Sequence, residues 1–409
     1  MNKPPKNYDE VIDWLYQQLP QFQTHGAVAF RPGLEKITRL TQYLGDPQKQ
    51  YPTLHIGGTN GKGSTSHMLA SVLQKAGYRV GLYTSPHLKD FRERIKINGQ
   101  LITKGHVVDF IHQHFSFFQE QHPTFFELTV AMAFEIFKIE KVDIAVIEVG
   151  MGGRLDATNI VEPLLSIITN ISLDHTQYLG TDRTQIAKEK AGIIKPHIPV
   201  IIGEKDPETA AVFESKAQAV CAPIFYSEDF ELPKPLQTDL KGIYQYKNLQ
   251  TTCTALQQLK GFEIALDALE NGLTQVAKTT GLMGRWQTIS SAPKIIADVS
   301  HNEAGFGFLK AQLKGENFNK LHVIIGFVKD KDLKNILSFL PQEASYYLTQ
   351  ANVPRSLGVF DLEAIFKETT LRHSTHLSVA AAFESAKDHA EKQDLILITG
   401  STFVVAEIL

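Results

Sequence analysis

Apolar residues follow two different periods along the first two thirds of the chain, and the two periods alternate. Short apolar runs, most of them rich in β-branched residues, predict buried strands at residues 53–56, 79–83, 95–97, 142–149, 164–170 and 200–202. Apolar positions three and four apart predict helices at 8–19, from 34 onward, around 68–73, and at 103–118, 126–137, 182–196, 207–219, 246–259 and 263–277. This order of strands and helices is typical of an α/β fold.

The C-terminal part of the chain shows the same alternation as a separate unit. Strands are predicted at 294–299, 320–325, 345–348 and 394–399, with helices at 303–313, 332–339, 361–368 and 378–391. Strands separated by helices imply right-handed crossovers and a mostly parallel sheet. Residues 221–240 are predicted to be irregular, and a break in the pattern at 279–292 predicts a linker. We therefore predict two domains, residues 1–285 and 286–409.

The stretch that joins the first buried strand to its helix has the composition of a phosphate-binding loop. Residues 55–66 read His-Ile-Gly-Gly-Thr-Asn-Gly-Lys-Gly-Ser-Thr-Ser. The glycines let the backbone approach an anion, the next helix points its first N–H groups at the same place, and Lys62 adds positive charge. The spacing departs from the usual P-loop, because Ile56 replaces its first glycine and Gly63 separates Lys62 from Ser64. The alternative is an ordinary glycine-rich turn.

Composition and charge narrow the range of partners. The chain has 409 residues, 43% of them hydrophobic, and a formal net charge of −3, which gives no reason to expect nucleic acid or an anionic membrane. The two cysteines, Cys221 and Cys253, form no disulfide framework and no metal-binding spacing. The sequence shows neither an export signal nor an apolar run long enough to span a membrane. We expect a cytoplasmic protein.

Polar residues follow several of the predicted strands, where ligands bind in open α/β sheets. Glu148 ends one strand, a loop at 150–159 rich in glycine follows it, and His175 comes after the next strand. A carboxylate at this edge favours a functional role, whereas His175 is as consistent with a satisfied histidine as with a metal or phosphate contact. In the C-terminal unit Asp298 and His301 follow the first strand, and polar loops at the ends of the others predict a ligand site there.

Six motifs in order resemble folylpolyglutamate synthase and dihydrofolate synthase, which belong to the Mur ligase superfamily. They are Gly58-Thr-Asn-Gly-Lys-Gly-Ser64, Ser85-Pro-His-Leu88, Glu148-Val-Gly-Met-Gly-Gly-Arg-Leu-Asp-Ala-Thr-Asn159, Leu173-Asp-His175, Glu189-Lys-Ala-Gly-Ile193 and His301-Asn302. The resemblance implies an N-terminal P-loop ATPase-type domain with a parallel sheet and a smaller, Rossmann-like C-terminal domain. It also implies ATP as a substrate and two bound magnesium ions.

The resemblance assigns roles to individual residues. It implies that ATP contacts Thr59, Asn60, Gly61, Lys62, Asn248, Arg285, Asp298 and His301, and that magnesium is held by Ser85, Glu148 and His175. It leaves Ser64, the more obvious P-loop hydroxyl, to cap the helix. Lys190 matches a lysine that is carbamylated in the family and then binds the second magnesium, although the residues alone would favour a solvated lysine on this helix. Lys62, His175 and Lys190 are the implied catalytic residues. Two departures are noted: Leu282-Met283 precede Gly284-Arg285, and Tyr244 replaces a common histidine.

The pterin-binding segments of the family match three short stretches of this chain. They are Phe30-Arg31-Pro32-Gly33, Thr124-Phe125-Phe126-Glu127 and Leu155-Asp156-Ala157. The two phenylalanines could flank a flat ring and Glu127 could accept hydrogen bonds from its N–H groups, but residues 124–127 equally suit the buried start of a helix. Arg31 could serve a carboxylate.

The implied reaction adds L-glutamate to dihydropteroate, to reduced folates, or to both. The carboxylate first takes the γ-phosphoryl group of ATP, and the amine of glutamate then displaces phosphate from the acyl phosphate. One alternative is another Mur-type ligase with a UDP-muramyl substrate, against which the short segment before the phosphate loop argues. Another is a nucleotide-binding switch without catalysis, against which the intact Lys62, Glu148, His175 and Lys190 argue. The family leads us to expect a monomer.

Overall fold

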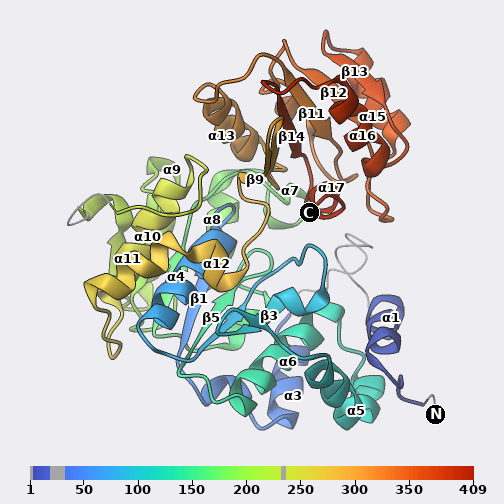
Figure 1. The fold of residues 1–409 in the computed structure, drawn as a ribbon. Coiled ribbons are helices and arrows are strands. Elements are labelled where there is room, and N and C mark those ends of the chain that lie inside the picture. Colours follow the sequence, from blue (N-terminus) through green and yellow to red (C-terminus); the bar gives the residue numbers. More distant parts are fainter. Residues whose placement is uncertain (1–2, 19–32, 232–235) are drawn as a thin grey trace. The chain divides into compact units, whose positions relative to one another are not determined.

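The structure, a computed structural model, describes residues 3–18, 33–231 and 236–409 of the chain. It divides the chain into two compact units (Figure 1). Unit 1 comprises Met1–Asp239 and Gln245–Gly281, and unit 2 comprises Leu240–Tyr244 and Leu282–Leu409. Each unit contains a mostly parallel sheet, which confirms the predicted α/β class. The structure divides the chain after Gly281 rather than after Arg285, and the brief passage of Leu240–Tyr244 into unit 2 was not predicted.

The described part of unit 1 is built on an eight-stranded sheet in the order β4-β3-β2-β5-β1-β6-β7-β8. Its strands are β1 (Thr53–Gly57), β2 (Val80–Tyr83), β3 (Ile95–Ile97), β4 (Gln100–Leu101), β5 (Ile144–Glu148), β6 (Leu165–Ile168), β7 (Val200–Ile202) and β8 (Ile224–Tyr226). The six neighbouring strands β2, β5, β1, β6, β7 and β8 are parallel. Strand β3 pairs antiparallel with β2 and, across a tight turn at Asn98-Gly99, with β4. The central position of β1 places the loop that follows it between the ends of β5 and β6.

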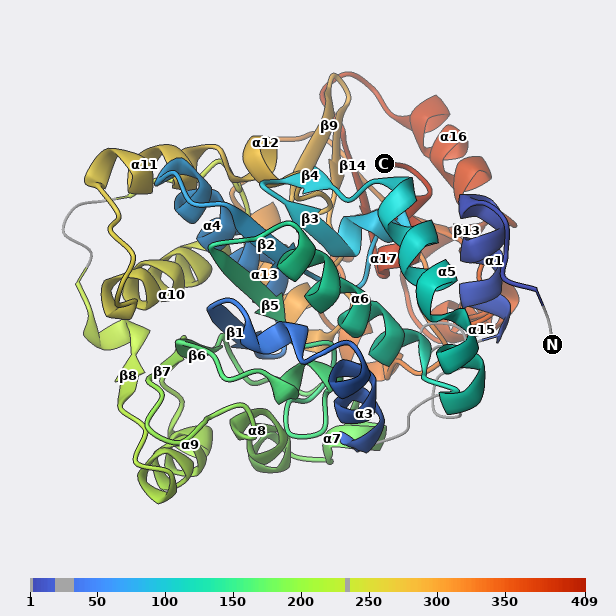
Figure 2. The same cartoon turned by 90° about the horizontal axis from the view of Figure 1, so that it is seen from below.

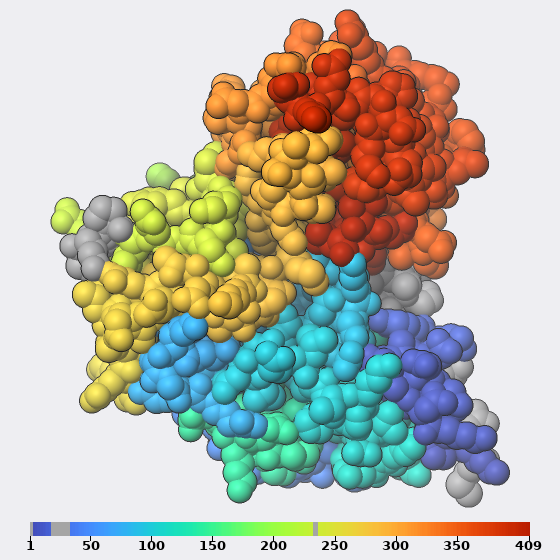
Figure 3. Space-filling model, in the orientation of Figure 1, coloured from blue at the N-terminus to red at the C-terminus, as the bar shows by residue number. Residues whose placement is uncertain are grey.

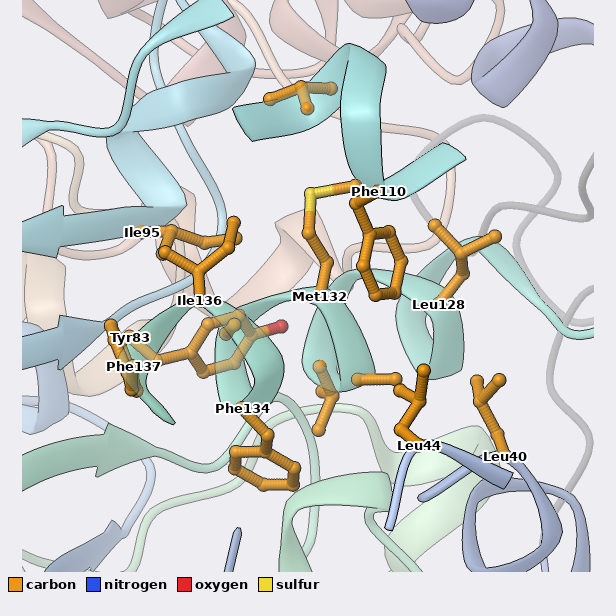
Figure 4. Close-up of a cluster of buried hydrophobic side chains, with 14 of the residues drawn as sticks. Leu40, Leu44, Tyr83, Ile95, Phe110, Leu128, Met132, Phe134, Ile136 and Phe137 are labelled. Atoms are coloured by element: carbon orange, nitrogen blue, oxygen red, sulfur yellow. The ribbon is translucent and has the colours of Figure 1, made fainter. Parts of the chain in front are cut away.

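Helices cover both faces of this sheet (Figure 2). They are α1 (Tyr8–Gln18), α3 (Glu35–Tyr43), α4 (Lys62–Lys75), α5 (Lys104–Gln121), α6 (Phe125–Ile139), α7 (Thr176–Leu179), α8 (Arg183–Ala191), α9 (Pro207–Ala219), α10 (Gln245–Gln258), α11 (Leu266–Thr274) and α12 (Val276–Thr280). Leu54 and Ile56 of β1 pack on the side of α4 and α10. On the other side, aromatic and aliphatic residues of α3, α5 and α6 form a second core (Figure 4). All five residues of β1 are buried, because helices cover the sheet on both faces.

Unit 2 has a six-stranded sheet in the order β13-β12-β11-β14-β10-β9 among its described residues. Its strands are β9 (Gln287–Ser291), β10 (Lys294–Ala297), β11 (Leu321–Ile325), β12 (Ser345–Leu348), β13 (Arg372–Thr375) and β14 (Leu395–Thr399). All of them are parallel except β9. The helices are α13 (Glu303–Leu313), α14 (Leu333–Leu337), α15 (Val359–Lys367), α16 (Val379–His389) and α17 (Thr402–Ala406).

The sequence patterns missed some elements for physical reasons. The strands β9 and β13 lie at the two edges of their sheet and read Gln-Thr-Ile-Ser-Ser and Arg-His-Ser-Thr, so neither carries an apolar run. The single helix predicted at 263–277 is wrong, because the chain breaks at Gln275 into α11 and α12. The carboxylate of Asp239 accepts hydrogen bonds from the N–H groups of Val276 and Ala277, which start the second helix. The short strand β8 and helix α17 were also not predicted.

Helices α11 and α4 of unit 1 pack closely together, and a substitution at their contact can test the packing. On the face shown in Figure 3 the surface of residues 266–280 adjoins that of α4. A Cβ atom at Gly272 of α11 would lie 2.5 Å from the Cα atom of Val72, where no side chain fits. We expect Gly272→Ala to lower the unfolding free energy by about 1–3 kcal/mol, the usual cost of overpacking, although alanine favours helix formation.

Urea unfolding measures this difference, and Gly105→Ala is the matched control. Gly105 lies in α5, where an added Cβ would meet nothing closer than 3.4 Å, so this variant should be at least as stable as the wild type. Equal stability of the two variants would contradict the packing described here.

Candidate active site

The phosphate loop lies between β1 and α4 and is shaped by two glycines that face neighbouring residues. Gly58 has φ +135° and a Cβ atom there would lie 1.9 Å from Oγ1 of Thr169. Gly61 has φ +83° and a Cβ atom there would lie 2.2 Å from Oδ1 of Asn248. Only glycine allows these approaches, since the backbone is left-handed and the space for a side chain is taken. The contact with Gly61 brings Asn248, a predicted ATP residue from α10, to the loop.

The segment after β6 holds the same loop from its other side. The N–H groups of Thr59 and Asn60 donate to the backbone oxygen and to Oδ1 of Asn170, at 2.9 and 3.0 Å. The Thr169 hydroxyl donates to the Asn60 carbonyl at 2.6 Å. Sequence reasoning missed Thr169 and Asn170, although their position at the end of a predicted strand was a usable signal. These bonds fix the loop before any ligand binds.

Helix α4 begins at Lys62, and Gly61 is its N-cap. The Lys62 ammonium donates to the carbonyls of Gly58 and Thr59 at 3.1 and 3.0 Å, so it is folded over the loop. The expectation that Ser64 caps the helix is wrong. Ser64 is buried inside the helix and accepts a hydrogen bond from Gln245 of α10 at 3.1 Å.

The strand order β2-β5-β1-β6 gathers several predicted residues at the carboxyl edge of the sheet. Glu148, at the end of β5, is 4% exposed, and its Oε2 accepts the Ser85 N–H at 3.0 Å. The hydroxyl of Ser85 and the carboxylate of Glu148 are oxygen donors of the kind that magnesium prefers. His175 follows β6 and has φ +51° at the start of α7. Within the described residues no group of three His, Cys, Asp or Glu side chains forms a complete metal site.

Lys190 points into this edge from α8 and is only 3% exposed, so the alternative of a solvated lysine is wrong, as the resemblance implied. Its Nζ donates to the Gly58 carbonyl at 2.7 Å, the same oxygen that Lys62 contacts. Burial, and to a smaller extent the charge of Lys62, lowers the pKa of Lys190 to about 7, while Asp174 and Asp156 oppose the change. Near neutral pH a large fraction of this amine is therefore unprotonated. Asp174, next to His175, belongs to the Leu173-Asp-His175 motif, in which the resemblance gave this carboxylate no separate role.

The predicted pterin residues fall into different surroundings. Phe30, Arg31 and Pro32 lie outside the described residues, and Gly33 is their described neighbour. Thr124 and Glu127 form a capping box at the start of α6, in which Oε2 of Glu127 accepts from both the N–H and the hydroxyl of Thr124. The structural interpretation of this pair is thus correct, and a binding role for Glu127 stays a prediction.

The two phenylalanines at this helix start differ in exposure. Phe125 is 3% exposed, stacks on Tyr16 at 5.7 Å between ring centroids, and lies 5.2 Å below the guanidinium of Arg94. Phe126 is partly exposed and lies against Gly150, where a Cβ atom would come within 2.4 Å of its ring. The exposed ring makes Phe126 the better candidate for contact with a planar ligand.

The third pterin segment begins the 3-10 helix η4 (Ala157–Ile160). Leu155 is partly exposed, whereas Asp156 and Ala157 are buried. Asp156 is the N-cap of η4, and its carboxylate accepts from the N–H groups of Thr158 and Met151 at 3.0 and 2.9 Å. The segment is therefore rigidly attached to the end of β5.

Unit 2 contains the remaining predicted ATP residues. Asp298, 1% exposed, follows β10, and its Oδ2 accepts from the Tyr244 hydroxyl at 2.6 Å and from the Trp286 N–H at 2.8 Å. Nδ1 of His301 donates to the Val299 carbonyl, 2.9 Å away. The guanidinium of Arg285 lies 3.4 Å from the carbonyls of Met283 and Gly284. Tyr244, where the resemblance leads us to expect histidine, thus donates to a carboxylate predicted to contact ATP, and that contact stays a prediction.

Comparison with known proteins identifies the family. Residues 56–268 match the Mur ligase middle domain, and residues 284–402 match the glutamate ligase domain of Mur ligases. The dihydrofolate synthase/folylpolyglutamate synthase of Bacillus subtilis is 32% identical, over 98% of both chains. The chain belongs to the dihydrofolate synthase/folylpolyglutamate synthase family of Mur ligases. Its members are ATP-dependent ligases.

Other similar proteins extend this result. A structure of E. coli FolC with DHPP and ADP has a TM-score of 0.86 and 30% identity, covering 100% of this chain and 98% of that one. A bifunctional synthase with Mn, AMPPNP and L-glutamate also has a TM-score of 0.86, at 28% identity and with the same coverage. A probable folylpolyglutamate synthase/dihydropteroate synthase of Haloferax volcanii is 31% identical over 98% of this chain, which spans half of that longer protein. Among the described residues, no helix of this chain is both long and apolar enough to cross a membrane.

The buried amine predicts a pH-dependent stability. Since the pKa of Lys190 is about 7 in the folded protein and about 10.4 in the unfolded chain, the unfolded state binds more protons between these values. The wild type should therefore gain stability relative to Lys190→Met as the pH rises from 7 to 9.5, by up to about tenfold in the folding equilibrium per pH unit. Urea unfolding in carbonate-free buffer measures the difference.

Lys188→Met is the matched control, because Lys188 lies on the same helix and is exposed. Its stability relative to the wild type should not change over this pH range. A wild-type advantage over Lys190→Met that is constant or falls with pH would contradict the lowered pKa.

Proposed function

We propose that the protein is a ligase that uses ATP to join L-glutamate to dihydropteroate, to a reduced folate, or to both. The observation that carries the proposal is the convergence of the phosphate loop, the Ser85–Glu148 pair and buried Lys190 at one edge of the sheet in unit 1. An edge that holds a triphosphate beside a metal site is what phosphoryl transfer to a carboxylate requires. Relatives solved with DHPP and ADP, and with L-glutamate and an ATP analogue, support these substrates.

The residues of the chain bind and orient the reactants. The start of α4 and the ammonium of Lys62 attract the phosphates, since helix N-termini and lysine favour anions. A pterin carboxylate placed in line takes the γ-phosphoryl group, and the amine of glutamate then displaces phosphate from the acyl phosphate. No protein nucleophile is required. Asn248 in unit 1, and Arg285, Asp298 and His301 in unit 2, are proposed to bind the rest of the nucleotide.

Ser85, Glu148 and His175 would hold a magnesium ion. When bound, magnesium neutralises phosphate charge and polarises the transferred group. The first two residues fit this role because both carry oxygen donors and the Ser85 N–H···Glu148 bond brings the two residues together. Lys190 fits a second magnesium only after carbamylation, since an amine offers no anionic oxygen to a hard cation.

Carbamylation of Lys190 is supported by its environment. Carbon dioxide reacts with an unprotonated amine, and burial makes this form abundant near neutral pH. The product would carry a negative charge next to Lys62, in place of the present repulsion between two lysines. We further propose that the protein acts as a monomer in the cytoplasm, as the sequence led us to expect.

ADP release by the purified protein tests the ligase proposal. With ATP and magnesium, turnover should require both L-glutamate and a pterin, and dihydropteroate and tetrahydrofolate are assayed separately. Stimulation by dihydropteroate establishes the first activity, and additional stimulation by tetrahydrofolate establishes the second. Turnover that neither pterin stimulates would reject the folate assignment, and stimulation by a UDP-muramyl substrate would replace it.

The carbamate can be observed directly without turnover. Protein equilibrated with 13C-bicarbonate should show a carbamate carbon resonance that grows as the pH rises through about 7, the pKa of Lys190. Lys190→Met should lose this resonance, and Lys188→Met should retain it. A spectrum that is the same for both variants would contradict carbamylation at Lys190.

A further inference from the structure

His55 is a buried polar residue in the strand that carries the phosphate loop. It lies in the middle of β1, is 0% exposed, and pairs in register with Ile147 and Ser166 on the neighbouring strands. Its Nε2 lies 2.9 Å from Oγ1 of Thr158 in η4. A buried imidazole in a central strand costs stability where its polar atoms lose water without gaining a hydrogen bond, as Nδ1 of His55 does among the described residues. The roles proposed above leave it without a function.

The hydrogen bonds around Thr158 fix where the protons lie. The Thr158 hydroxyl donates its single proton to Oδ1 of Asp156 at 2.5 Å, so towards His55 it can only accept. Nε2 of His55 must therefore carry a proton. Nδ1 of His55 meets no hydrogen-bond partner among the described residues, which suits its unprotonated state. The order is His55 Nε2–H to Thr158 Oγ1, and Thr158 Oγ1–H to Asp156 Oδ1.

This series of bonds ends at the carboxylate of Asp156, a residue of one of the predicted pterin-binding segments. Oδ1 of Asp156 accepts from Thr158, while Oδ2 accepts the Met151 N–H at 2.9 Å. A Cβ atom at Gly150 would lie 3.1 Å from Oδ2 of Asp156 and 2.4 Å from the ring of Phe126. The bare glycine thus separates the carboxylate from the partly exposed ring. The direction of the carboxylate is set by Thr158, and the direction of Thr158 by His55.

We infer that His55 is a positioning residue that orients Asp156, through Thr158, for the pterin end of the acceptor substrate. The inference rests on the proposed function and extends it, because it makes a side chain of the phosphate-loop strand serve the other substrate. His55 touches neither substrate. Burial, with a smaller contribution from the charge of Lys195, lowers the pKa of His55 to about 3, so the ring stays neutral in the working range of pH.

Steady-state kinetics of matched variants test the inference. His55→Leu removes the donor, and His55→Gln places an amide N–H near the position of Nε2. Thr158→Val and Thr158→Ser make the same comparison at the next residue. We expect His55→Leu and Thr158→Val each to raise the KM for dihydropteroate about five- to tenfold, the size of one buried hydrogen bond, and the two conservative variants to restore it.

The KM for ATP separates positioning from general damage to the strand. Because β1 leads directly into the phosphate loop, a distorted strand would raise the KM for ATP as well, whereas loss of orientation at Asp156 would leave it unchanged. The double variant His55→Leu/Thr158→Val should be no worse than either single variant, since both remove the same bond series. A raised KM for ATP alone, or additive effects in the double variant, would overturn the inference.

A measurement on the wild type does not depend on activity or on variants that fold. In protein labelled with 15N at histidine, two-bond 1H–15N spectra should show His55 as the neutral Nε2–H form from pH 5 to 9. An Nδ1–H form, or protonation near pH 6.5, would overturn the bond series. Wild-type protein that shows this form but no pterin-dependent turnover would instead reject the proposed function, so the two failures are distinguishable.

Discussion

The parallel pairing of β1 with β5 and β6 is the constraint on which the rest of unit 1 depends. Parallel strands end at the same edge of the sheet. The phosphate loop, Glu148 and the segment from Thr169 to His175 therefore meet there although they are far apart in the sequence. The loop is then fixed by groups from its neighbours, because Gly58 fits against Thr169 and Asn60 is bound by Asn170. The site is therefore a property of the sheet more than of the loop.

Burial of charge gives this edge its chemistry. Lys190 and Lys62 both donate to the carbonyl of Gly58, which places two amines within reach of one acceptor. Loss of water, and to a smaller extent repulsion by Lys62, lowers the pKa of Lys190, whereas Lys188 on the same helix lies exposed. The face of α8 on which a lysine lies, and not its residue type, decides whether that lysine is buried at this edge.

The sequence predicted most of the fold because the buried strands carry clear apolar runs. The central strands of both sheets and nearly all long helices begin and end close to their predicted positions. The edge strands β9 and β13 are polar and were therefore not predicted. Asp239, which is far from residue 276 in the sequence, binds the backbone where the predicted helix is interrupted. At the site, motifs predicted Lys62, Glu148 and Lys190, but Thr169, Asn170 and His55 act through contacts that only the folded chain creates. Lys190 lies four and three residues after the buried Ile186 and Ala187, so its burial follows from the face of α8 on which it lies.

The path of the chain between the units has a consequence for how the protein can be divided. The segment Leu240–Tyr244 belongs to unit 2 although residues on both sides of it belong to unit 1, so the backbone crosses between the units three times. This segment supplies Tyr244, whose hydroxyl donates to Asp298. A fragment that starts at Leu282 would contain every strand of the second sheet and still lack one of the hydrogen-bond donors to the buried carboxylate of Asp298. The two compact units are therefore not separable modules of the sequence.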